Sequence, residues 1–167
     1  MSAIPSTFVD CALVASDGTG TPVTASLALF NGEMSLSGIA QNGQQVTVIE
    51  SQGSVVGARK GARSIPTLTV GAHLSTPLDA FRKLILGETA STTSTTSAIG
   101  DAFTVDLALS LNLPDGETRT VNLEDCLCVS CELTIGDPSS VSLEIQCLGA
   151  IKMTDASGST TTIRAGL

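Results

Sequence analysis

The stretch "AFTVDLALSLNL", residues 102–113, has the most regular pattern of apolar and polar residues in this chain. Apolar side chains occupy every second position: Phe103, Val105, Leu107, Leu109, Leu111 and Leu113. Thr104, Asp106, Ser110 and Asn112 lie between them. A period of two is typical of a β-strand with one buried face and one solvated face. The stretch therefore predicts a strand in a two-faced sheet.

Two further β-prone runs follow it, "TVNLEDCLCVSCELTI" (120–135) and "VSLEIQCLGAI" (141–151). Turn-forming residues separate the three runs: "PDGE" lies between the first and the second, and "GDPSS" between the second and the third. We predict a three-stranded antiparallel meander over residues 102–151.

The N-terminal half contains shorter β-prone runs: "TFVDCALVAS", "TPVTASLALFN", "EMSLSGI", "QQVTVIESQGSVVGA" and "SIPTLTVGAHL". One segment, "TPLDAFRKLILG", predicts an α-helix at about residues 77–86. Leu78, Phe81 and Ile85 recur there at helical spacing, and Gly87 can terminate the helix. A Ser/Thr-rich segment at 88–101 predicts a long loop. Together these signals predict a single domain, 1–167, that is mainly antiparallel β with one helix.

Composition limits the classes of function. The chain has 167 residues, with 16 acidic and 8 basic side chains and a net charge of −8, which disfavours ordinary nucleic-acid binding. We expect no membrane span, because no apolar run approaches about 18 residues. The N-terminus lacks the basic region of a secretory signal, and the cysteine count is odd, so we expect reduced thiols.

The sequence offers little material for catalysis. His73 is the single histidine, and nothing local supports a cysteine–histidine pair. "DGTGTP" is not followed by a predicted helix, which argues against a phosphate-binding loop. We therefore predict no enzyme activity, no cofactor and no metal.

Three of the five cysteines lie in "CLCVSC", residues 126–131. Strand alternation predicts that Cys126 and Cys128 share the polar face, with Cys131 on the apolar face. The segment has no turn residue of the kind found in a zinc knuckle. If Ile135 aligns with Val141, Cys131 and Cys147 are diagonal neighbours. We predict packing of free thiols; a metal or redox site is the alternative.

The polar faces are acidic. In the same alignment Glu132 lies opposite Glu144, an unfavourable pair in an isolated sheet, and Asp106 and Glu124 also lie on polar faces. Such a surface is either simply solvated or is a face along which an anion passes without binding. A separate basic segment, "GARKGAR", is either a flexible loop or a subunit contact.

The order of these features resembles the phage major tail tube proteins. The resemblance covers about residues 45–151. It rests on the basic turn and strand "VVGARKGARSIPTLTVGAHL", the helix "PLDAFRKLILG", a Ser/Thr loop, and "RTVNLEDCLCVSCELTIGDPSSVSLEIQCLGAI". It implies an antiparallel β-sandwich or barrel with a flanking helix and long loops. It also implies hexameric rings that stack into a hollow tube with a negative lumen.

The resemblance implies a structural virion protein of the tail, synthesised in the host cytoplasm. Its implied partners are further copies of itself, the tape measure protein, the tail terminator and tail tip proteins, with DNA only in transit and no membrane. The candidate lumen residues are Asp106, Glu124, Glu132 and Glu144; the candidate contacts between subunits or rings are Arg59, Lys60, Arg63 and the loop 88–101. A capsid decoration protein and a secretion-system tube protein are the alternatives.

Overall fold

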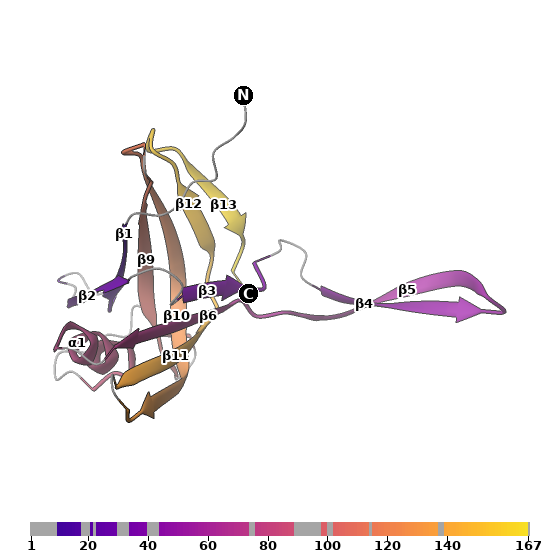
Figure 1. Cartoon of the computed structure of the whole chain (residues 1–167). Coiled ribbons are helices and arrows are strands. Elements are labelled where there is room, and N and C mark those ends of the chain that lie inside the picture. Colours follow the sequence, from indigo (N-terminus) through magenta and orange to yellow (C-terminus); the bar gives the residue numbers. More distant parts are fainter. Residues whose placement is uncertain are drawn as a thin grey trace.

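The computed structural model describes residues 10–17, 21, 23–29, 34–39, 44–73, 76–88, 98–99, 102–113, 115–136 and 139–166. Within them the chain is mainly β with one helix, as predicted (Figure 1). The elements are β1 (Asp10–Ser16), β2 (Thr24–Leu29), β3 (Met34–Ser37), β4 (Gln44–Ser51), β5 (Ser54–Arg63), β6 (Thr67–His73), α1 (Thr76–Ile85), β7 (Ala98–Ile99), β8 (Ala102–Phe103), β9 (Val105–Asn112), β10 (Thr118–Thr134), β11 (Ser140–Cys147), β12 (Ile151–Thr154) and β13 (Thr160–Arg164).

One large antiparallel sheet organises the globular body. Its strand order is β2-β1-β9-β10-β11-β6-β3, and β12 and β13 extend it from a second position along β10. The predicted meander is confirmed, because β9 pairs with β10 and β10 pairs with β11. In Figure 1 the strands β3, β6 and β11 run across the direction of β9 and β10, so the sheet curves around its core.

The core lies on one face of this curved sheet. It is formed by alternating residues of the strands, including Leu13, Leu68, Leu107, Leu123, Leu143 and Ile145. Helix α1 contributes Leu78, Phe81, Leu84 and Ile85, all at most 3% exposed, so three predicted anchors are confirmed and Leu84 is added. Gly87, at φ +70°, ends the helix as predicted.

Strand β10 carries two irregularities that overturn the predicted polar face of Cys126 and Cys128. Its pairing with β9 shifts between Leu123 and Cys126, where Asp125 adopts φ +51°. Its pairing with β11 shifts again between Cys128 and Ser130. Each β-bulge inserts one residue and reverses the in–out alternation. Cys126 therefore lies in the core, not on the polar face.

The predicted strand 141–151 is divided into β11 and β12, which follow one another along the same side of β10. The division coincides with the first bulge of β10. There Gly149 N–H donates to the carbonyl of Glu124 (3.0 Å), and Glu124 N–H donates to the carbonyl of Ala150 (3.0 Å). A Cβ on Gly149 would lie 2.6 Å from the Glu124 carbonyl oxygen. Glycine is therefore required where the two strands meet.

Strands β4 and β5 form a separate two-stranded hairpin, which we call the arm (residues 44–63); it projects from the body in Figure 1. Its tip is Gln52–Gly53, and both residues have positive φ, as in a tight hairpin turn. The segment "GARKGAR" is thus part of strand β5 and not a loop, which corrects the first interpretation of it. Most of the predicted Ser/Thr loop, 89–97, lies outside the described residues.

Candidate functional site

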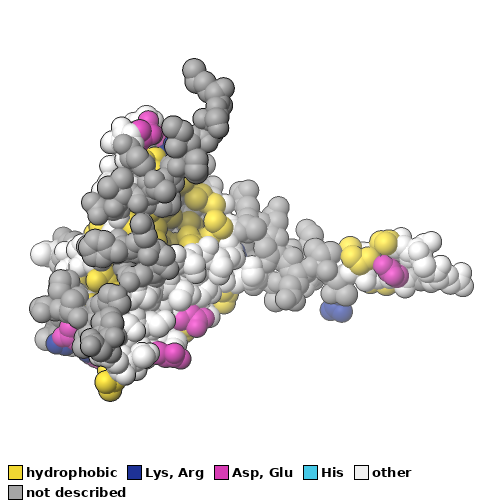
Figure 2. Space-filling view, in the orientation of Figure 1, with side chains coloured by type: hydrophobic (Ala, Val, Ile, Leu, Met, Phe, Trp, Pro, Cys, Tyr) yellow, Lys and Arg dark blue, Asp and Glu magenta, His cyan; other side chains and the backbone are white. Residues whose placement is uncertain are grey.

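The candidate site is the face of the sheet opposite the core, which we call the outer face. Cross-strand pairs define it: Ser16 with Asp106, Ala108 with Asn122, Ser130 with Glu144, Glu144 with Thr69, and Thr69 with Ser35. Its side chains are mostly small and polar, because each alternates with a core residue on the same strand. Figure 2 shows acidic side chains on an otherwise largely neutral surface of the body.

Three predicted acidic residues map to this face, but one predicted pairing is wrong. Asp106, Glu132 and Glu144 all alternate with core-facing positions. Glu132 lies opposite Ser142, and Glu144 lies opposite Ser130. Leu133, not Ile135, lies opposite Val141, so the register differs by two residues from the predicted one and the two glutamates do not repel each other as a direct pair. Both side chains are exposed.

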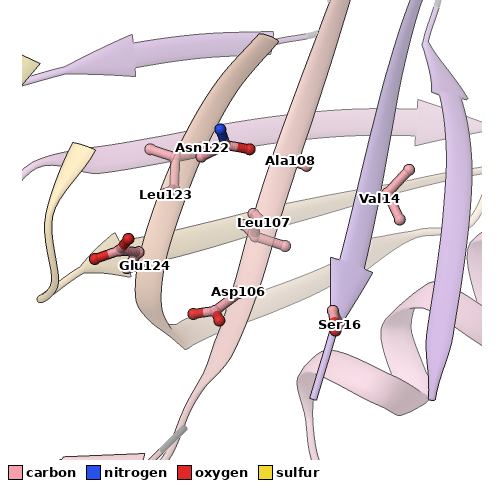
Figure 3. Close-up of a pocket in the computed structure, with 8 residues that line it drawn as sticks. All are labelled: Val14, Ser16, Asp106, Leu107, Ala108, Asn122, Leu123 and Glu124. Atoms are coloured by element: carbon pink, nitrogen blue, oxygen red, sulfur yellow. The ribbon is translucent and has the colours of Figure 1, made fainter. Parts of the chain in front are cut away.

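A shallow pocket marks the part of the outer face beside the first bulge of β10 (Figure 3). It has a volume of about 270 Å³ and is lined by Val14, Ser16, Asp106, Leu107, Ala108, Asn122, Leu123 and Glu124. The carboxylates of Asp106 and Glu124 come from neighbouring strands, β9 and β10. The fourth predicted acidic residue, Glu124, forms an ion pair with Lys152 of β12. Lys152 was not foreseen, because β12 had no signal of its own.

The pKa of Asp106, one carboxyl of this pocket, is shifted by its surroundings. Burial raises the pKa of Asp106 above its usual value of 3.8, and the charges of Asp125 and Glu124 raise it further. The backbone N–H of Asp125 donates to Asp106 Oδ1 (3.0 Å), which opposes the increase. Asp106 thus stabilises the bulge, because it accepts a hydrogen bond from the backbone N–H of Asp125.

We predict that Asp106→Asn stabilises the protein at pH 7. A raised folded-state pKa means that protonation of Asp106 favours folding, and that this contribution is lost as pH rises through the folded pKa. Asn keeps an oxygen acceptor for the Asp125 N–H and removes the charge. We expect a gain of at most about 1 kcal/mol, because the Asp106 side chain is only partly buried and solvent screens its charge. The gain should shrink as pH falls towards 4.

Urea unfolding followed by circular dichroism at several pH values measures this effect. Glu144→Gln, at an exposed position of the same face, is the control and should change stability less. A variant that is less stable than the parent at pH 7 would contradict the electrostatic explanation.

All five cysteines are free thiols. Cys126 and Cys147 are each 1% exposed and lie directly opposite each other, with their Sγ atoms 3.6 Å apart. Cys131, which alternation predicted to be buried, is exposed instead. It shares the core side of the sheet with Leu143, but lies beyond the part of the sheet that the core covers. Among the described residues no group of three His, Cys, Asp or Glu side chains is placed to hold a metal ion.

We predict a strong order of thiol reactivity. The thiolate is the reactive form. The hydrogen bond with Cys147 and burial raise the pKa of Cys126, and burial beside Cys131 raises that of Cys128 to about 11. Alkylation with iodoacetamide at pH 8, mapped by mass spectrometry, should label Cys131 at least about a hundredfold faster than Cys126, which needs opening of the structure. Equal rates in the folded protein would contradict the assigned burial.

Two groups of exposed apolar side chains were not predicted. The first lies on the arm: Val48, Ile49 and Val55 are 49–67% exposed. Figure 2 shows apolar side chains on the arm. The second lies at the end of β10 and just beyond it: Val129, Leu133 and Ile135 are 45–86% exposed. The sequence contained a weak signal for the arm, because Gly53 interrupts the β-prone run "QQVTVIESQGSVVGA" and isolated glycines often mark turns.

The basic candidates are only partly located. Arg59, Lys60 and Arg63 all belong to β5, and the side chain of Arg59 is exposed. The side chains of Lys60 and Arg63 lie outside what the structure describes. No helix in the described ranges is both long and apolar enough to cross a membrane.

Three solved structures have a similar fold. A chain of the anti-feeding prophage (AFP) baseplate matches with a TM-score of 0.52 at 14% identity, over 93% of this chain and 99% of that chain. A chain of the PVC sheath/tube terminator, from an extracellular contractile injection system, matches with a TM-score of 0.52 at 12% identity, over 92% and 99%. Hcp1 of E. coli EAEC 042 matches with a TM-score of 0.50 at 9% identity, over 92% and 97%.

This chain has a fold similar to that of Hcp1 and of chains in the AFP baseplate and the PVC sheath/tube terminator. The resemblance to tail tube proteins is therefore confirmed at the level of the fold. No family model matches the chain, and no curated protein matches its sequence.

Proposed function

We propose that this chain is a structural subunit of a hollow tail or secretion tube, and that its copies assemble into stacked hexameric rings. The outer face is the observation that carries the proposal. It is a broad sheet face of Ser, Thr, Ala and acidic side chains, and much of it is open to solvent. A polar face of this kind suits the wall of a water-filled channel, whereas a face that packs against protein would carry larger apolar residues.

The charge of the outer face suits the passage of a polyanion. Asp106, Glu132 and Glu144 contribute negative charge there, while Lys152 neutralises Glu124 in part. Such a wall repels phosphates, so DNA moves through without being retained. We propose that the tube belongs to a phage tail in the virion, made in the host cytoplasm. Its further partners would be the tape measure, tail terminator and tail tip proteins.

The arm is the proposed contact between subunits or rings. An isolated two-stranded hairpin is marginally stable in water, and this one exposes Val48, Ile49 and Val55. In an assembling tube, a second copy of the chain would cover these apolar side chains. Arg59, Lys60 and Arg63 add positive charge to β5, which complements a subunit with a net charge of −8.

A secretion-system tube is the second candidate, and the fold match to Hcp1 favours it. It shares the structural, non-enzymatic role of the first candidate and differs in what passes through the channel. A capsid decoration protein, the other alternative, has no observation in its favour.

Negative-stain microscopy of concentrated purified protein tests the proposal. We expect rings or striated tubes with a central channel, and class averages should show sixfold symmetry. A protein that stays monomeric at every concentration would overturn the proposal.

We predict that the double variant Glu132→Lys, Glu144→Lys makes assembled tubes retain DNA. Two charge reversals per subunit, repeated around each ring, convert a repelling wall into an attracting one. We expect at least about a tenfold increase in the amount of a fluorescent oligonucleotide that sediments with tubes at low salt. Glu117→Lys, an exposed position before β10, is the control for nonspecific charge. Equal retention by the double variant and the control would contradict the lumen assignment.

A further inference from the structure

Gly38, which precedes the arm, and Ser64, which follows it, both contact one buried arginine, Arg164. The chain leaves the body after β3 at Gly38 and returns through Ser64 before β6. Arg164, at the end of β13, is 1% exposed. Its Nη1 donates to the carbonyl of Gly38, and its Nη2 donates to the carbonyl of Ser64. One guanidinium therefore bridges residues before and after the arm, whose described strands pair with no strand of the large sheet.

We call the place where Gly38 and Ser64 meet Arg164 the root of the arm. The two chain segments lie close together there. Gly38 has φ +71°, and a Cβ there would lie 3.3 Å from both the carbonyl oxygen of Ile65 and Cα of Pro66. Ser37 Oγ donates to the carbonyl of Thr67 (3.4 Å). Beyond the root, the described residues of β4 and β5 pair as strands with each other and with no strand of the large sheet. The contacts at Gly38 and Ser64 therefore set the direction of the arm relative to the body.

Arg164 also connects this root to the centre of the sheet. It lies opposite Ile151 of β12, and Ile151 lies opposite Leu123 of β10, next to the first bulge. Gly166, two residues further on, lies close to the Gly149–Ala150 backbone: a Cβ on Gly166 would be 3.3–3.4 Å from its atoms. The end of β13 is therefore anchored to the body on both sides of Arg164.

We propose that Arg164 is a positioning residue that clamps the root of the arm and holds the arm in one direction relative to the sheet. A planar guanidinium presents several donors in a fixed fork, so it can hold two carbonyls at once. A lysine ammonium lacks this fork. Burial of Arg164 strengthens the effect, because a buried charge that loses its hydrogen-bond partners is costly. The consequence for assembly rests on the proposed function, since a rigidly aimed arm meets its neighbour with less loss of entropy.

Hydrogen–deuterium exchange by mass spectrometry, on dilute unassembled subunits, tests the clamp. In Arg164→Met and Arg164→Lys we expect the amides of residues 44–63 to exchange at least about tenfold faster than in the parent, with β9 and β10 unchanged. Arg164→Lys keeps the charge and the long stem, and it serves as the second variant if Arg164→Met does not fold.

Leu109→Val is the matched control, because it weakens the buried core at β9, which is separated from β13 by β10 and β12. It should not accelerate exchange in the arm selectively. Unchanged exchange of the arm in both Arg164 variants, or an equal acceleration of the arm and of β9, would overturn the clamp. The readout does not require tubes, so it remains decisive if the proposed function fails. If the arm is loosened and tubes still form normally, the clamp stands and the contact role of the arm fails.

Discussion

Gly149→Ala is expected to lower the free energy of unfolding by about 3 kcal/mol or more. The new Cβ would lie 2.6 Å from the Glu124 carbonyl oxygen and 2.7 Å from its carbonyl carbon. These are backbone atoms of β10, so no side-chain rotation can relieve the clash. The strands must separate, which also breaks the hydrogen bond from Gly149 N–H to Glu124 and weakens the one from Glu124 N–H to Ala150.

Gly57→Ala is the matched control for this prediction. Gly57 lies in β5, and a Cβ there meets nothing within 4 Å. The control should change stability by no more than about 0.5 kcal/mol. Urea unfolding is followed by far-UV circular dichroism, because the chain has no Trp or Tyr. Similar unfolding midpoints for the two variants would show that the backbone contact at Gly149 is not tight.

Phe81→Ala is expected to cost about 3–5 kcal/mol, a large fraction of the stability of a domain of this size. Phe81 is fully buried on the inner side of α1, between Leu78 and Ile85 on the same helical face. The core otherwise consists mainly of Leu, Ile, Val, Ala and Cys, so few neighbouring side chains are large enough to fill the cavity. We expect the helix to loosen from the sheet.

Leu86→Ala, one residue beyond the helix and 36% exposed, is the control for loss of apolar volume in the same region. It should cost less than about 1.5 kcal/mol. The urea midpoints give the comparison, and faster hydrogen exchange in residues 78–85 of Phe81→Ala would locate the effect. A loss below 1.5 kcal/mol for Phe81→Ala as well would mean that the helix contributes little to the core.

Much of the fold could be predicted because its signals are local. Residues 105–112 alternate without interruption, and β9 follows that alternation with Val105, Leu107 and Leu109 buried. The helix has its apolar residues at helical spacing and a glycine at its end, and both features are found in the structure. By contrast, β12 and β13 were not predicted, because short strands of mixed polarity carry no clear period.

The candidate site was predicted in part, for the same reason. Asp106 lies on a regular strand, so alternation placed it on the outer face correctly. Cys126 and Cys128 lie between two bulges, and there the same rule placed them on the wrong side. The ion pair of Glu124 with Lys152 joins residues 28 positions apart, and it depends on how β12 docks beside β10. No local pattern contains that information.

The sequence by itself determined the fold class, the helix, the meander and the acidic, thiol-containing composition, because these follow from periodicity and residue chemistry within short windows. Only the tertiary structure decided which face each cysteine occupies, where β11 passes into β12, and that the basic segment is a strand of a projecting arm. A β-bulge reverses the in–out alternation of the residues between it and the next bulge, and here the first bulge of β10 lies where Gly149, far along the chain, approaches Glu124. The same holds for Arg164, whose two acceptors are set by chain segments 126 and 100 residues away.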